Sequence, residues 1–155
     1  MTGLNLRCYE HIVKAKLVGM PDQPGIAADI FASLAEQGIS IELIIASATG
    51  KGKGDISIAL HENELPAAAA SLEQIKTRLG ARELVTDQSL ALLSFSGEAL
   101  TLDPGLTARI FKVLGTKGVN LQMISQSLNS ISFLIPRDKL ADSLTTIRES
   151  FEVTG

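Results

Sequence analysis

Two stretches of this chain are similar to each other over 21 residues. When Pro24 is aligned with Pro104, residues 24–44 and 104–124 carry the same residue at eight positions. The shared positions include the Pro-Gly pair that begins each stretch and an Ile-Phe pair in its middle. Similarity at a fixed offset indicates repeated structural units. A chain of 155 residues therefore divides into two units of about 70–80 residues each, a common domain size.

The similarity continues beyond these stretches, with one change of offset. Ile56-Ser57 corresponds to Ile131-Ser132, so the second copy is five residues shorter before this point. The missing residues fall where the first copy has the Gly- and Lys-rich stretch 50–54. Lengths vary most in surface loops. We therefore interpret this stretch as the loop of a hairpin.

The hydrophobic pattern of the first copy predicts two helices among four strands. Apolar residues recur at helical spacing after Pro24, at Ile26, Ile30, Phe31 and Leu34. In chain order, the expected elements are a strand at 11–19, a helix from 24 to 38, strands at 40–47 and 55–60, a helix at 64–79 and a short strand at 82–86. The order β-α-β-β-α-β is that of the ferredoxin-like fold.

The second copy follows the same order but shows no fourth strand. Its expected elements are a strand at 89–96, a helix at 104–117, strands at 120–127 and 130–135, and a helix at 137–150. A spare strand-like run, residues 2–8, precedes the first copy. We expect this run to complete the second unit, because as a frayed arm it would leave a sheet edge unpaired. The prediction is an α+β protein of two ferredoxin-like units, with the first (residues 11–87) inserted into the second (residues 88–155 plus the strand 2–8).

Composition and charge exclude several classes of protein. The net charge is −3 and aromatic residues make up 4% of the chain, with no basic stripe, so we expect no nucleic-acid partner. No apolar run approaches the roughly 18 residues of a membrane helix, and no signal peptide is visible. We therefore expect no membrane partner and a cytoplasmic location. Cys8 is the one cysteine, which excludes an internal disulfide.

The sequence offers few groups for catalysis. His11 and His61 stand fifty residues apart and belong to no catalytic or metal-binding motif. The Gly- and Lys-rich stretch lacks the spacing of a phosphate-binding loop. We expect no catalytic residues, no metal and no cofactor. The chain is more typical of a binding module than of an enzyme.

The motif Asp22-Gln23-Pro24-Gly25, followed by the passage Leu34–Ile41, resembles the ACT domain, a ferredoxin-like module that senses ligands. Nearly the whole chain is covered by the resemblance. The two copies in tandem are similar to the regulatory half of aspartate kinase. The segments that carry this similarity are Asp22–Gly25, Ile39–Ile44, Asp103–Leu106 and Asn120–Ser125.

The resemblance implies a homodimer that binds a feedback inhibitor, threonine or lysine, between the first unit of one chain and the second unit of the other. It also implies a catalytic kinase domain or subunit as a partner. The positions implied for the effector site are Asp22, Gln23, Pro24, Gly25, Ile26, Ala27, Ser40, Ile41, Ala46, Asn120, Leu121 and Ile124. Four positions depart from the family pattern: Ser40, Ala46, Leu128 and Asp103 stand where the family has asparagine, glutamine, glutamate and histidine. Because Ser40 and Ala46 are small, we expect threonine first.

The helix that follows Pro24-Gly25 has a physical reason to bind such a ligand. Its N-terminus offers unpaired amides and a partial positive charge to a carboxylate, and Asp22 could meet the ammonium group. Alternatively, Asp22 caps the helix and Pro24-Gly25 forms its turn, without any ligand. Two other functions stay open: a free-standing sensor that regulates another enzyme or gene expression through a partner, and a small ferredoxin-like enzyme, which the composition disfavours.

Overall fold

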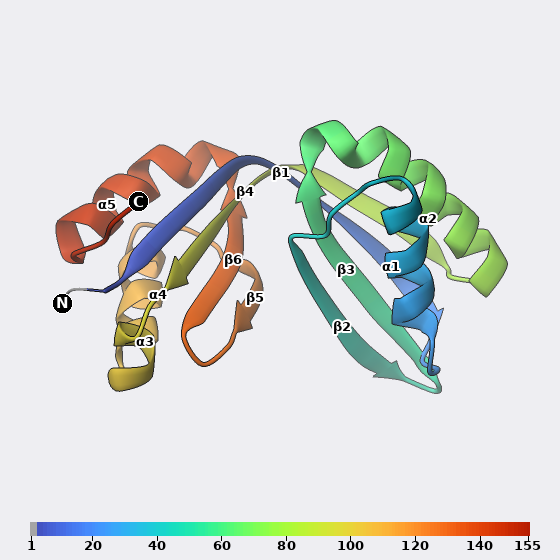
Figure 1. The fold of residues 1–155 in the computed structure, drawn as a ribbon, viewed down its shortest axis with the longest axis horizontal. Coiled ribbons are helices and arrows are strands. Elements are labelled where there is room, and N and C mark those ends of the chain that lie inside the picture. The colour runs from blue at the N-terminus through green and yellow to red at the C-terminus, as the bar shows by residue number, and fades with distance from the viewer. Residues whose placement is uncertain (1–2) are drawn as a thin grey trace. The chain divides into compact units, whose positions relative to one another are not determined.

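The computed structural model describes residues 3–155, so Thr2, the first residue of the expected N-terminal strand, lies outside the described range. The chain divides into two compact units. The first unit is Ile12–Gln88, and the second unit combines the described residues up to His11 with Ser89–Gly155. Two long strands, β1 (Asn5–Pro21) and β4 (Glu83–Ser96), contribute to both units (Figure 1). The two strand-like runs before Asp22 are thus one continuous strand.

The first unit has the expected ferredoxin-like order. After β1 come α1 (Ile26–Glu36), β2 (Leu43–Gly50), β3 (Lys53–His61), a 3₁₀ turn η1 (Glu62–Glu64) and α2 (Leu65–Leu79), and β4 begins the return. The strands lie in the order β2-β3-β1-β4. β3 pairs antiparallel with both β1 and β2. In Figure 1, α1 and α2 lie side by side on one face of these strands.

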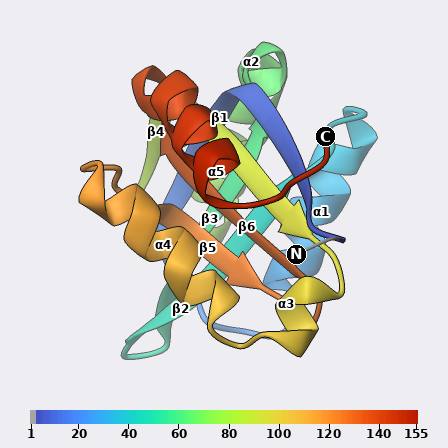
Figure 2. The same ribbon diagram turned by 90° about the vertical axis from the view of Figure 1, so that its left-hand side faces the viewer.

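The second unit repeats this plan with one additional helix. Its elements after β4 are α3 (Ala99–Leu102), α4 (Leu106–Thr116), β5 (Gln122–Gln126), β6 (Ser130–Pro136), a 3₁₀ turn η2 (Arg137–Lys139) and α5 (Leu140–Ser150). The strand order is β1-β4-β6-β5. Figure 2 views this unit with α4 and α5 together in front of the strands. The short helix α3 was not predicted, because four residues are too few for a periodic pattern.

Each unit has its own hydrophobic core between its helices and its strands. In the first unit, alternate residues of β1 (Val13, Ala15 and Leu17) contact the helical stripe that includes Ile30 and Leu34. In the second unit, Phe95 and Phe133 stack with ring centroids 6.1 Å apart, and Leu4 and Leu6 belong to the same cluster. Full burial of such a side chain contributes about 1.5–3 kcal/mol. The two repeats thus fold around separate cores.

Two predictions for the first helix were wrong. We predicted that Pro24 would lie in the first turn, but α1 begins at Ile26. Gly25 has φ +91°, in the left-handed region, which keeps it outside the helix. We also placed Phe31 on the buried stripe, yet 43% of its surface is exposed.

Candidate functional site

The predicted effector loop opens onto a pocket of the first unit. The pocket has a volume of about 250 Å³ and lies between the end of β1, the first turn of α1 and the β2–β3 hairpin. Its lining residues are Met20, Pro21, Asp22, Gln23, Ile26, Ala27, Ala46, Ser47, Ala48, Gly54, Asp55 and Ile56. Five predicted positions are therefore brought together here: Asp22, Gln23, Ile26, Ala27 and Ala46.

The backbone holds the Asp22 loop against the hairpin. The amide of Asp22 donates a hydrogen bond of 2.8 Å to the carbonyl of Gly52. The Asp22 side chain does not cap α1, because the helix has no side-chain cap. Among the described residues, the Asp22 carboxylate has no hydrogen bond or ion pair. The loop thus presents a carboxylate to the pocket and leaves it available to a ligand.

The start of α1 supplies the complementary charge. First-turn amides of a helix have no partner within the helix, and they favour an anion such as a carboxylate. Ile26 and Ala27 of this turn line the pocket. The positive end of α1 on one wall and the Asp22 carboxylate on another suit a zwitterion, which carries both a carboxylate and an ammonium group.

A second carboxylate, Asp55 on β3, also lines the pocket, and we did not predict it. Asp55 accepts a hydrogen bond of 3.0 Å from the amide of Gly19 and lies 3.5 Å from the Nζ atom of Lys16. Its side chain is 18% exposed. The one sequence signal was its position at the start of the return strand. Its place on the pocket wall depends on strand register, which pairs Asp55 with Ser47.

Small residues shape the hairpin wall. Ala46 and Ala48 on β2 face Ile56 and Gly54 on β3. A Cβ atom on Gly54 would lie 2.8 Å from the carbonyl oxygen of Ser47, which is too close for any other residue without movement of the hairpin. The close approach of these two strands therefore requires glycine and keeps the pocket wall narrow.

The other predicted site residues lie outside this pocket. Pro24 and Gly25 form the turn before α1. Ser40 is exposed and Ile41 packs against the first core. Asn120, Leu121 and Ile124 belong to the second unit, where Leu121 packs against the second core and the other two residues are exposed. Leu128, another departure from the family pattern, is 85% exposed.

The candidate catalytic groups do not converge on the pocket. His61 lies 3.1 Å from the Oε1 atom of Glu42, measured from its Nε2 atom. Partial burial, with a contribution from Glu10, raises the pKa of the Cys8 thiol, which disfavours a reactive thiolate. Within residues 3–155, no three His, Cys, Asp or Glu side chains are grouped to hold a metal ion. In the same range, no helix is long and apolar enough to cross a membrane.

Comparisons with known proteins agree with this description of two repeats. Models of the ACT domain match residues 17–80 and 93–151. Aspartokinase from Mycobacterium tuberculosis is 31% identical over 144 residues, which are 92% of this chain and 34% of that protein. This chain thus spans about a third of the length of that relative.

Solved structures are similar over nearly the whole chain. The ligand-free regulatory subunit of aspartate kinase from Thermus thermophilus has a TM-score of 0.85 and 30% identity, and the match covers 97% of this chain and 98% of that one. A structure of aspartokinase alpha and beta subunits has a TM-score of 0.84 at 24% identity, over 95% of this chain and 97% of the other. Aspartokinase III from E. coli, in complex with lysine and aspartate, shares the fold with a TM-score of 0.69 at 23% identity, over 96% of this chain and 33% of that one.

Proposed function

Because the chain belongs to the family of tandem ACT-domain regulatory subunits of aspartate kinase, we propose that its first-unit pocket binds the effector, threonine or lysine. The observation that carries this proposal is the Asp22 carboxylate, which lines the pocket without a partner among the described residues. A free amino acid would place its carboxylate at the start of α1 and its ammonium group at Asp22. Asp55, whose charge is offset by Lys16, would form part of the pocket wall.

The proposal includes a site shared between two copies of the chain. Asn120, Leu121 and Ile124 of a second copy would cover the pocket of the first. The resulting homodimer would act on a catalytic kinase subunit or domain in the cytoplasm. The effector would change activity by favouring one arrangement of this assembly, as differential binding requires.

A melting scan tests the ligand. Each of the twenty amino acids is added at about 10 mM, which is near 100 times a dissociation constant of 0.1 mM and would add about 2.7 kcal/mol of stability. The melting temperature should rise by roughly 5–10 °C with threonine or lysine. Asp22→Ala should abolish the rise. Asp29→Ala is the matched control, because Asp29 lies in the first turn of α1 but does not line the pocket. No rise with any amino acid contradicts the proposal.

Mixing two defective chains tests the shared site. Asp22→Ala and Asn120→Ala should each lose binding as homodimers. A mixed dimer would have one site with both defects and one with neither. Equal amounts of the two chains give mixed dimers in half of the population after exchange, so about a quarter of the binding capacity should return, as measured by calorimetry. If mixing restores nothing while each variant remains dimeric by light scattering, the two positions do not form one site across chains.

A further inference from the structure

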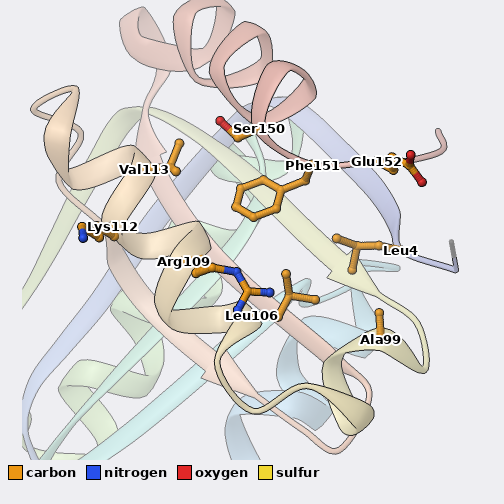
Figure 3. A pocket seen from close by; sticks show the side chains of 9 residues that line it. All are labelled: Leu4, Ala99, Leu106, Arg109, Lys112, Val113, Ser150, Phe151 and Glu152. Atoms are coloured by element: carbon orange, nitrogen blue, oxygen red, sulfur yellow. The ribbon is translucent and has the colours of Figure 1, made fainter. Parts of the chain in front are cut away.

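The second unit contains a larger cavity among its helices and its terminal segments. Its volume is about 510 Å³, within the usual range for small-molecule sites. α4 forms one wall, and Leu4, just before β1, and the end of α5 with the residues that follow it form the opposite one (Figure 3). The cavity lies entirely within the second unit. It is therefore distinct from the effector pocket proposed above.

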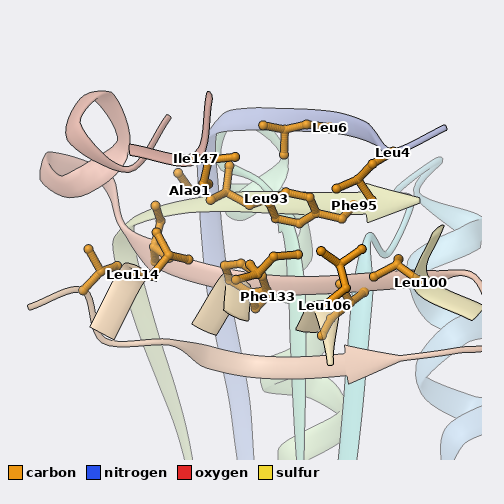
Figure 4. Close-up of a cluster of buried hydrophobic side chains, with 14 of the residues drawn as sticks. Leu4, Leu6, Ala91, Leu93, Phe95, Leu100, Leu106, Leu114, Phe133 and Ile147 are labelled. Atoms are coloured by element: carbon orange, nitrogen blue, oxygen red, sulfur yellow. The ribbon is translucent and has the colours of Figure 1, made fainter. Parts of the chain in front are cut away.

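The cavity is mainly apolar and adjoins the second core. Leu4 and Leu106 belong both to the cavity lining and to the core cluster (Figure 4). Phe151 and Val113 extend this apolar surface toward solvent, and the ring of Phe151 stands at the centre of the lining (Figure 3). An apolar ligand body gains about 25 cal/mol for each Å² that such a surface removes from water.

One guanidinium group supplies a fixed cationic contact. Arg109 turns its head toward Leu106, below the Phe151 ring (Figure 3). Its Nη2 atom donates to the Oδ2 atom of Asp103 at 2.5 Å, and Asp103 also accepts a 3.0 Å hydrogen bond from the amide of Gly105. Arginine has five N–H donors, and among the described residues no partner engages those on its Nε and Nη1 atoms. Asp103 thus orients Arg109 and leaves donors for an anion.

The charges around the cavity favour a monoanion or a zwitterion. Lys112 and Glu152 lie at opposite ends of the lining (Figure 3). With Arg109, the lining has two positive groups and one negative group, and Asp103 pairs with Arg109 from outside the lining. This ion pair reduces the positive field that a doubly charged phosphate would need. A carboxylate with an apolar body meets the guanidinium and the apolar wall together, and its ammonium group, where present, meets Glu152.

The repeat supplies an internal comparison for these residues. The first-unit positions aligned with Arg109, Lys112 and Val113 hold Asp29, Ala32 and Ser33. The cationic and apolar lining is therefore a property of the second copy. We propose that this cavity is a second ligand site, which binds a small carboxylic acid with an apolar side chain through Arg109.

Binding in this cavity would stabilise the contact between the two ends of the described chain. The amide of Leu6 donates a hydrogen bond of 2.8 Å to the carbonyl of Thr154. The amide of Thr154 donates one of 3.0 Å to the carbonyl of Leu4. Leu4 and Phe151 both line the cavity, so a ligand between them would stabilise this pairing. Amide signals of residues 4–6 and 151–154 are therefore the natural reporters.

The test is a titration of the full chain followed by ¹⁵N NMR. The probes are L-leucine, L-phenylalanine, 4-methyl-2-oxopentanoate and inorganic phosphate. Leucine or the oxo acid should shift the reporter amides, and phosphate should not. If leucine and the oxo acid both bind, the site recognises the carboxylate. If only the amino acids bind, the site also recognises the ammonium group. No shift with any organic acid at 10 mM, or an equal response to phosphate, overturns the proposal.

Variants identify the group that binds. Arg109→Gln should weaken binding by on the order of ten- to a hundredfold, as loss of a charge-assisted hydrogen bond does. Arg109→Lys keeps a positive charge beside Asp103 but loses the paired N–H donors of the guanidinium, so it should weaken binding by less than Arg109→Gln. It also serves as a variant that retains the ion pair if Arg109→Gln does not fold. Asp22→Ala should leave the dissociation constant within about threefold, a difference below 1 kcal/mol, because Asp22 lines the first-unit pocket and not this cavity. Unchanged binding in both Arg109 variants overturns the proposal.

Discussion

The two repeats contain the same Pro-Gly turn but stabilise it differently. In the first unit Gly25 has φ +91°, and in the second Gly105 has φ −80°. Asp103 closes the second turn through the Gly105 amide and the Arg109 guanidinium. The aligned positions in the first unit are Gln23 and Asp29, which form no such pair. Both turns have the equivalent backbone hydrogen bonds, but only the second turn adds a side-chain hydrogen bond and an ion pair.

A second difference concerns one aromatic pair. Phe31 and Phe111 are identical positions of the repeat. Phe111 packs edge-on against Phe133 with ring centroids 5.6 Å apart, whereas Phe31 is 43% exposed. The residue aligned with Phe133 in the first unit is Ile58. The same helical residue thus packs against the core in one copy and is exposed in the other, and only the second copy offers it an aromatic partner.

The largest expected effect separates the two phenylalanines. Phe111→Ala should lower the free energy of unfolding by about 2–3 kcal/mol. A fully buried phenylalanine would cost about 3–5 kcal/mol, but Phe111 is only half-buried. Phe31→Ala should cost about 1 kcal/mol, since much of its surface is already exposed. Native-state hydrogen exchange measures each unit separately. Equal costs at both positions would show that the aromatic contact contributes little to the second core.

The next prediction compares the two glycines. Gly25→Ala should cost about 1–2 kcal/mol, because an L-residue is strained at positive φ. Gly105→Ala keeps an allowed φ and restricts the unfolded chain, a gain of about 0.4–1 kcal/mol. Its Cβ would lie 3.2 Å from Arg109 Nη1 and 3.3 Å from Asp103 Oδ1, which offsets that gain. Urea denaturation should therefore show a clear loss for the first variant and little change for the second. The reverse order would mean that the two turns do not differ in strain.

The smallest effect is a pH dependence confined to the second turn. The hydrogen bond from Arg109 lowers the pKa of Asp103, assisted by the Gly105 amide. A lowered folded-state pKa gives stability that is present above the unfolded value of about 3.9 and is lost as pH falls through the folded value. In an NMR titration the Gly105 amide should report a midpoint below about 3.9. Arg109→Gln should move the midpoint upward, and an unmoved midpoint would exclude the ion pair as the cause.

Much of the architecture could be predicted from the sequence alone. The repeat from Pro24 to Gly38 and from Pro104 to Gly118 predicted two units, and the stripe of Ile30 and Leu34 predicted a helix with a buried face. These patterns are local or repeated, so hydrophobic periodicity records them directly. The motif Asp22–Gly25 and its counterpart Asp103–Leu106, each followed by a similar strand (Ile39–Ile44 and Asn120–Ser125), together indicated the family.

The details of the pocket depended on tertiary structure. No local pattern showed that Asp103 would form an ion pair and that Asp22 would not. The difference depends on Arg109, which lies six residues after Asp103 and one turn into the next helix. Asp55 reaches the pocket wall through the register of β2 with β3 and is held there by the amide of Gly19, 36 residues earlier in the chain. Such contacts join residues that are distant in sequence, and their geometry is set when the strands pair.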